Sequence, residues 1–154
     1  MILEMEHEQR AARVTARCVM GWVTPVTPAT LNDAVYARFQ AEKDLQTLPV
    51  VEDGIPRGII NRLALIGRFI PSYAKAFRGE DVCAGLMNAN PLIVSSDISI
   101  GELSYLLADG EKNALADGFI VVQDGRYAGV GSAQQLLREL VWTCTDAGAE
   151  LQRP

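Results

Sequence analysis

The sequence predicts an α/β (α+β) fold made of two similar units that follow one another along the chain. Three observations lead to this prediction. The stretch from Pro49 to Asn61 returns 71 residues later, from Ile120 to Ser132, with the same order of apolar, turn and small residues. Each copy holds an Asp-Gly pair between two runs that favour β-structure, which is typical of a hairpin. Apolar residues at helical spacing lie on both sides of each hairpin.

The hairpins are predicted from their turns. Asp53-Gly54 and Asp124-Gly125 suit a type I′ turn, in which both central residues take positive φ. The second strand of each hairpin ends at Asn61 or Ser132, and either residue can cap a following helix. Gln135 stands three residues after Ser132, which is the spacing of a capping box.

The segments before the hairpins also correspond. An extended segment begins at Met20 in the first copy and at Met87 in the second. Thr30 and Ser99 then precede apolar stripes and are predicted to cap helices, each followed three residues later by an acidic residue. Each copy therefore reads as an extended segment, a helix, a two-stranded hairpin and a second helix, a β-α-β-β-α unit.

These patterns divide the chain into five parts. We expect an N-terminal helix, a first repeat, a linker that contains Pro and Gly, a second repeat and a C-terminal tail that ends a helix. Their boundaries are 1–17, 18–69, 70–81, 82–141 and 142–154.

Composition excludes several classes of function. The 154 residues carry a formal charge of −5, whereas a nucleic-acid surface needs clustered Lys and Arg. No apolar run approaches the roughly 18 residues of a membrane-spanning helix, and the acidic N-terminus lacks the pattern of a secretion signal. Three widely spaced cysteines favour reduced thiols and a cytoplasmic protein. One His and no paired Cys spacing predict no metal site.

An enzyme is not expected either. The sequence contains no nucleophile elbow, no phosphate-binding Gly-Lys loop and no His-Glu-x-x-His pair. Asp53 and Asp124 are explained as turn residues, and no other cluster of carboxylates stands out.

The duplicated unit resembles the tandem cystathionine-β-synthase (CBS) domain, also called a Bateman module. The residues that carry the resemblance are the two hairpins, Leu48 to Ile60 and Phe119 to Gly131, together with the starts of the preceding segments and helices. The likeness covers roughly residues 18–141. The stretch Ile59-Ile-Asn-Arg, together with the stretch from Asp117 to Tyr127, is also similar to CBS pairs found beside GGDEF or EAL domains in bacteria.

The resemblance implies a regulatory module. In that family two repeats pack sheet to sheet with pseudo-two-fold symmetry, leave two clefts that take adenosine compounds, and often form dimers. It implies no required cofactor, AMP, ADP, ATP or S-adenosylmethionine as a regulatory ligand, a homodimer, and an effector domain on the same chain or on a partner. It implies no role for nucleic acid or membrane.

The resemblance also indicates candidate site residues. Nucleotide-binding members place a hydroxyl after the hairpin and an Asp three residues later; this sequence has Asn61 and Ala64 in one copy, Ser132 and Gln135 in the other. Neither copy has the Asp, which favours an alternative, a ligand-free dimerisation scaffold. Ser132 and Gln135 keep more polar capacity, so we expect the ligand there, between walls formed by the extended segments near Thr24 and from Asn90 to Ile93. The full set of candidates is Trp22, Thr24, Asn61, Arg62, Ile93, Val121, Ser132 and Gln135.

Each candidate also has a purely structural interpretation. Trp22 could stack on an adenine or belong to a core or interface. Arg62 could bind a phosphate, but a solvated arginine on the surface explains it as well. The glycines of the hairpins could admit a ligand or another part of the chain.

Overall fold

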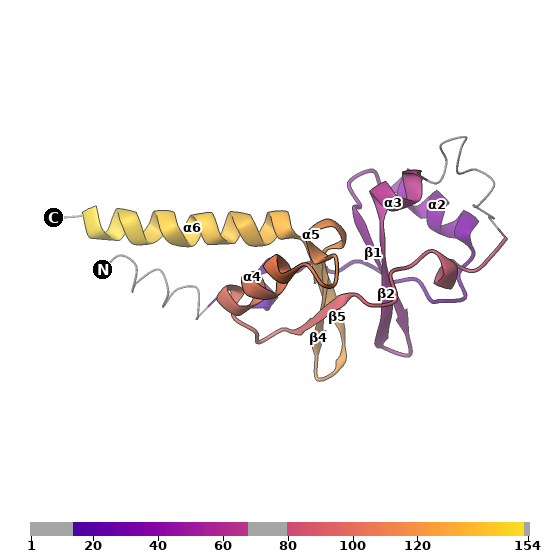
Figure 1. The fold of residues 1–154 in the computed structure, drawn as a ribbon, viewed down its shortest axis with the longest axis horizontal. Coiled ribbons are helices and arrows are strands. Elements are labelled where there is room, and N and C mark those ends of the chain that lie inside the picture. The colour runs from indigo at the N-terminus through magenta and orange to yellow at the C-terminus, as the bar shows by residue number, and fades with distance from the viewer. Residues whose placement is uncertain (1–13, 68–79, 153–154) are drawn as a thin grey trace.

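Each repeat forms its own small sheet in the computed structural model, which describes residues 14–67 and 80–152 (Figure 1). In the first repeat, β1 (Thr47–Glu52) and β2 (Ile55–Asn61) form an antiparallel hairpin. In the second, β3 (Leu92–Ser95) runs parallel to β4 (Phe119–Gln123), which pairs antiparallel with β5 (Arg126–Gly131). The predicted α+β class is confirmed.

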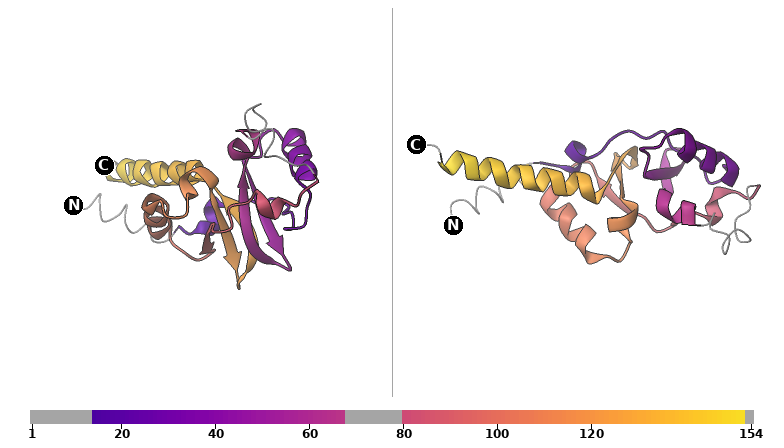
Figure 2. Two further views of the ribbon diagram at one scale, coloured as in Figure 1. Left: turned by 45° about the vertical axis from the view of Figure 1, so that its right-hand side comes forward. Right: turned by 90° about the horizontal axis from the view of Figure 1, so that it is seen from above.

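Helices surround the two sheets. They are η1 (Ala16–Val19), α2 (Asn32–Ala41), α3 (Arg62–Gly67), η2 (Cys83–Gly85), α4 (Ile100–Asp109), α5 (Ala114–Asp117) and α6 (Ala133–Gln152). The last of these, α6, runs along the long axis of the molecule and away from both sheets (Figures 1 and 2). Most of the predicted N-terminal helix and of the linker lies outside the described residues, and the described residues 16–19 form a short 3-10 helix.

The local predictions for turns and caps are largely confirmed. Asp53 and Asp124 have φ of 53° and 54°, as a type I′ turn requires. The Ser99 hydroxyl accepts a hydrogen bond from the backbone N–H of Glu102 at 3.1 Å and caps α4. Asn61 caps α3, because its Oδ1 accepts from the Leu63 N–H at 2.8 Å.

The prediction that Thr30 caps the first long helix is wrong. The cap residue of α2 is Leu31, which makes no side-chain hydrogen bond to the helix. The Thr30 hydroxyl instead accepts from the backbone N–H of Thr27 at 3.1 Å, in the turn before the helix. Tertiary pairing explains the later start, since Leu31 forms a β-bridge with Val82.

The extended segment of the first repeat is shorter than its counterpart. In the second repeat four residues of β3 pair with β4, whereas in the first only Val26 pairs with Val50. Pro25 and Pro28 flank Val26 and have no N–H to donate to a ladder, so the pairing cannot extend.

The chain segment that leads into each repeat pairs with the sheet of the other repeat. We call these two segments, around Gly21 and around Asn88, the lead-in segments. The backbone of Gly21 exchanges two hydrogen bonds with Val130 on β5, at 2.9 and 3.0 Å. The backbone of Asn88 does the same with Ile59 on β2, at 2.8 and 3.1 Å. These crossed lead-in segments tie the two sheets together in a pseudo-symmetric way.

Apolar side chains form three clusters. One lies within the second repeat and includes Phe119, and another lies within the first and includes Leu48. A third, smaller cluster of Ile59, Ile120 and Val130 draws on both sheets and forms the contact between the repeats. The sheets therefore pack against each other through an apolar seam, as the resemblance implied.

The crossing of the lead-in segments requires glycine at one position in each hairpin. A Cβ built on Gly58 would lie 2.6 Å from Sδ of Met87 and 2.8 Å from the carbonyl oxygen of Asn88. A Cβ on Gly129 would lie 2.9 Å from the carbonyl oxygen of Gly21. The close approach at these glycines is therefore made by the chain itself.

We expect Gly58→Ala to lower the free energy of unfolding by about 1–3 kcal/mol, the usual cost of overpacking. The added methyl must push the backbone of Asn88 away from β2. Urea unfolding followed by circular dichroism measures the change. Gly85→Ala is the control, because a Cβ there meets nothing within 4 Å. Equal stability of the two variants would contradict the packing role of Gly58.

Candidate ligand-binding site

Two cavities lie between the repeats in corresponding places. The first, of about 320 Å³, is lined by residues 21–23, by residues 44–47 and by the start of α6; we call it the Ser132 cavity. The second, of about 370 Å³, is lined by the end of β2, by residues 86–88 and 90, and by residues 111–113 and 117; we call it the Asn61 cavity. Ser132 and Asn61 occupy equivalent positions after the two hairpins.

The Ser132 cavity is built around the N-terminal end of α6. The predicted capping box is present: the Ser132 N–H donates to Oε1 of Gln135 at 3.0 Å, and the Gln135 N–H donates to the Ser132 hydroxyl oxygen at 3.2 Å. The hydroxyl also donates to Oε1 of Gln135 at 3.4 Å, a long bond that an acceptor in the cavity can replace. The cap thus fixes both polar side chains at the cavity wall.

Trp22 supplies an aromatic face to the same cavity. Its side chain is 65% exposed, an unusually high value for a Trp residue. Its ring lies 4.9 Å from the ring of Tyr127, tilted by 49°. One edge of the indole is therefore held by the protein, and enough of the ring is open to stack on a planar ligand.

Tyr127 fixes the segment that carries Trp22. The Tyr127 hydroxyl donates to the carbonyl oxygen of Val23 at 2.5 Å and accepts from the Val23 N–H at 3.3 Å. Burial raises the pKa of Tyr127, and this effect exceeds the opposing effects of the bond to Val23 and of the Arg38 charge. The phenol therefore keeps its proton, and the bond to Val23, at neutral pH.

A carboxylate also lines the Ser132 cavity. Asp44, in the loop between α2 and β1, is exposed and lies among the lining residues. It lies in a different element from Ala64 and Gln135, the two positions at which the resemblance implied an Asp. A carboxylate here can accept hydrogen bonds from hydroxyl or amine groups of a ligand.

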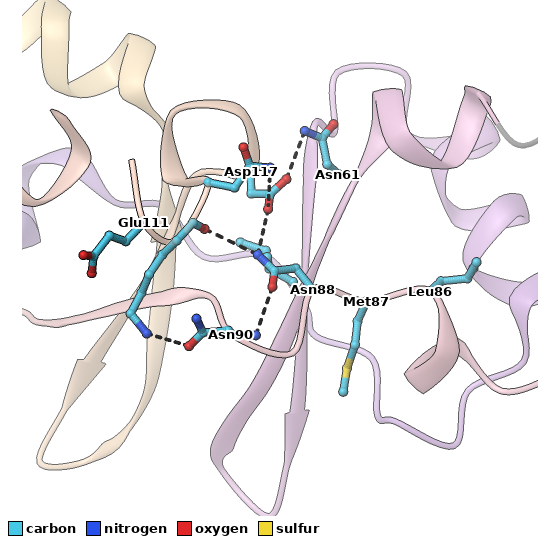
Figure 3. Close-up of a pocket in the computed structure, with 10 residues that line it drawn as sticks. Asn61, Leu86, Met87, Asn88, Asn90, Glu111 and Asp117 are labelled. Carbon is cyan, nitrogen blue, oxygen red and sulfur yellow. Dashed lines mark hydrogen bonds between the residues drawn. The ribbon is translucent and has the colours of Figure 1, made fainter. Parts of the chain in front are cut away.

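The Asn61 cavity differs because its polar groups bond to one another (Figure 3). The carboxylate of Asp117, which is only 6% exposed, accepts from the side-chain amides of three asparagines. These are Asn61 at 3.3 Å, Asn88 at 3.0 Å and Asn113 at 3.3 Å. Asn61 also donates to the carbonyl oxygen of Ala116 at 2.8 Å. The network joins β2 of the first repeat to the lead-in segment and α5 of the second.

The predicted site residues fall into separate places. Trp22, Ser132 and Gln135 meet in the Ser132 cavity, and Asn61 lies in the Asn61 cavity, as does Asn90 from the predicted wall. Thr24 is exposed and lines neither cavity.

Three other predicted residues lie away from both cavities. Ile93 is 42% exposed on β3, and Val121 is fully buried in the core of the second repeat. Arg62 is engaged by the protein: Nε donates to the carbonyl oxygen of Leu45 at 2.6 Å, and a terminal nitrogen donates to that of Phe39 at 2.6 Å. Its guanidinium also lies 5.1 Å above the Phe39 ring and holds the end of α2.

Sequence reasoning missed Asp44, Asn88 and Asp117. Asp117 ends a helix of only four residues, and its partners lie 4, 29 and 56 positions away. No local pattern marks such a network. Asp44 lies just before β1 in a polar stretch, where nothing indicates that the other repeat's helix stands opposite.

Two features are absent from residues 14–67 and 80–152, the part of the chain that the structure describes. Within these ranges no three His, Cys, Asp or Glu side chains gather in a way that could hold a metal ion. Among the helices described there, none combines the length and the apolar character needed to cross a membrane.

Comparisons with known proteins identify a family for part of the chain and a fold for most of it. The family model described as CBS domain matches residues 80–141. The structure of CBSX2 from Arabidopsis thaliana in complex with AMP is 21% identical, covers 84% of this chain and 97% of its own, and superposes with a TM-score of 0.64. The CBS domain of a bacterial CNNM/CorC family Mg²⁺ transporter in complex with ATP is 16% identical, with coverage of 90% and 96% and a TM-score of 0.68. No curated protein matches the chain.

Proposed function

Since residues 80–141 form a CBS domain and the chain has the fold of CBS-pair proteins, we propose that it is a regulatory module that binds an adenosine-type nucleotide in the Ser132 cavity. It acts as a sensor and not as an enzyme. The observation that carries the proposal is the meeting of an open indole face, a fixed hydroxyl and an exposed carboxylate around one cavity. Relatives of this fold in complex with AMP and ATP support the choice of ligand class.

The Ser132 cavity is the better of the two candidates. In the Asn61 cavity, the buried carboxylate of Asp117 is bonded to three amides, so a ligand there must first displace protein contacts. In the Ser132 cavity, Trp22 and Asp44 are exposed. We therefore place one nucleotide on each chain, with its base on Trp22 and its ribose or phosphate hydrogen-bonded to Ser132 and Gln135.

The output of the module follows from α6. The residues that contact the ligand stand at the first turn of a 20-residue helix, so a small tilt at the cavity becomes a larger displacement about 30 Å away. We propose that this helix passes the binding signal to an effector domain on the same chain or on a partner. Homodimer formation, a cytoplasmic location and a link to GGDEF or EAL signalling proteins are part of this proposal.

A ligand-free dimerisation scaffold is the second candidate function. Two observations favour it. The two motif positions hold Ala64 and Gln135 in place of Asp, and the polar side chains of the Asn61 cavity bond to one another. A thermal-shift panel of AMP, ADP, ATP and S-adenosylmethionine separates the two. Ligand at about 100 times its Kd adds ~2.7 kcal/mol of stability, which raises the Tm by roughly 5–11 °C.

We expect Ser132→Ala to weaken nucleotide binding by about tenfold, since one hydrogen bond to a charged group is lost. Isothermal titration calorimetry with the nucleotide that gives the largest thermal shift measures it. The same change also removes a helix cap, which costs about 1 kcal/mol of stability.

Ser99→Ala is the matched control, because Ser99 caps α4 in the same way and lies in neither cavity. It should lose similar stability and keep full nucleotide affinity. Equal affinities for the Ser132→Ala and Ser99→Ala variants would refute the assignment of the site.

A further inference from the structure

A third cavity continues the Ser132 cavity along α6. It has a volume of about 220 Å³ and is lined by residues 18–20 and by Gln135, Arg138, Glu139 and Trp142. Gln135 lines both cavities. The Ser132 cavity alone stands at the small end of the roughly 300–1,000 Å³ that ligand sites occupy, and the two cavities together lie well inside this range.

The two cavities form one groove between the same two chain segments. One wall is the run of residues 18–23, of which 18–20 line the third cavity and 21–23 line the Ser132 cavity. The other wall is α6, where Gln135, Arg138 and Trp142 are spaced by three and four residues and so share one face. From Gln135 to Trp142 the helix rises about 10 Å.

Each cavity of the groove has its own exposed tryptophan. Trp22 in the Ser132 cavity is 65% exposed, and Trp142 in the third cavity is 62% exposed. These are the two tryptophans of the chain. Exposed indole faces are suited to stacking on nucleobases, so the groove offers one stacking surface near each end.

The place of Arg138 in the groove favours a phosphate between two nucleosides. Arg138 stands on α6 between Gln135, which lines both cavities, and Trp142, and its side chain is exposed. A guanidinium can bind phosphate oxygens through two N–H groups at once. A phosphate that meets Arg138 therefore lies between a base on Trp22 and a second base on Trp142.

We propose that this groove binds a dinucleotide, a ligand with two nucleosides joined through phosphate. One base stacks on Trp22, the linkage passes Gln135 and meets Arg138, and the second base stacks on Trp142. This inference rests on the proposed function and specifies its ligand class.

The experiment compares diadenosine diphosphate with AMP by isothermal titration calorimetry on the full chain. We expect diadenosine diphosphate to bind about tenfold or more tightly, which is the gain from stacking a second base. Trp142→Ala should abolish this preference and change AMP affinity by less than about twofold. Arg138→Gln should weaken the binding of diadenosine diphosphate and change AMP affinity by less than about twofold.

Tyr105→Ala is the control, because Tyr105 is an aromatic residue that is 80% exposed on α4 and lies outside the groove. It should leave both affinities unchanged. Binding of AMP without a preference for diadenosine diphosphate overturns this inference alone. An equal loss of both ligands in Trp142→Ala also overturns it, and no binding of either ligand overturns the proposed function with it.

Discussion

Phe119→Ala should be the most destabilising single change of those considered, costing about 3–5 kcal/mol of unfolding free energy. Phe119 is fully buried in the second repeat, where it pairs with Leu92 on β3 and with Gly131 on β5. A Cβ built on Gly131 would lie 2.3 Å from Cζ of Phe119, so the ring lies directly on the Gly131 backbone. Removal of the ring leaves a cavity that this backbone cannot fill.

Differential scanning calorimetry measures the effect as a fall in Tm of roughly 6–20 °C for a chain of this size. If Phe119→Ala does not fold, Phe119→Leu keeps most of the volume and gives a smaller loss of the same sign. Tyr105→Ala removes an aromatic ring that is 80% exposed and should change stability by less than about 0.5 kcal/mol. A loss of under about 1 kcal/mol for Phe119→Ala would contradict its central place in the core.

The second large effect is expected from Asp117→Ala, at about 2–3 kcal/mol. This change leaves three asparagine amides without their acceptor in the Asn61 cavity, where Asn61 and Asn88 belong to segments on either side of the contact between the repeats. Because the carboxylate bonds to several donors at once, its removal costs more than that of a single surface hydrogen bond. Urea unfolding followed by circular dichroism measures the loss.

Asp97→Ala is the matched control for this prediction. Asp97 is a carboxylate whose side chain is 84% exposed, and it lies 3.6 Å from Arg17 in a surface ion pair. Such pairs contribute little, so we expect a change of less than about 1 kcal/mol. Asp117→Asn should fall between the two, since it keeps the volume but offers one acceptor oxygen. If Asp117→Ala were as stable as Asp97→Ala, the network would not hold the repeats together.

Short-range features of the fold could be predicted from the sequence. The Asp53 and Asp124 turns, the Ser99 cap and the Ser132–Gln135 capping box each depend on residues within four positions of one another. Their physical causes, positive φ and open backbone N–H groups, act locally and so leave a mark in the local sequence. Because the sequence is repeated, similar local signals occur in both halves of the molecule.

Long-range features could not be predicted in the same way. Thr30 has the spacing of a helix cap, but the bridge from Leu31 to Val82 starts the helix later. Arg62 reads as a free cation and is bound to carbonyl oxygens at the end of α2. In both cases the decisive partner lies on another segment, and no periodicity in one sequence reveals it.

Of the candidate site, sequence reasoning found Trp22, Ser132 and Gln135 but placed Val121 beside them. Val121 lies on the face of β4 that packs into the core of the second repeat, whereas its neighbour Ile120 lies on the face toward the other sheet. The places of Asp44 and Asp117 in the two cavities could not be predicted, because each cavity takes its walls from both repeats.

The crossed lead-in segments also bear on the origin of the molecule. In a chain of one repeat, the edge residue that here is Ile59 or Val130 finds no partner, because its own lead-in lies on the other side of the hairpin. Two such chains satisfy each other by exchanging lead-ins, as domain-swapped dimers do. Duplication and fusion of the gene turn that exchange between molecules into one within a molecule. The present chain has the architecture of such a fused dimer, which frees its two halves to diverge into one cavity with exposed Trp22 and Asp44 and one whose polar side chains bond to one another.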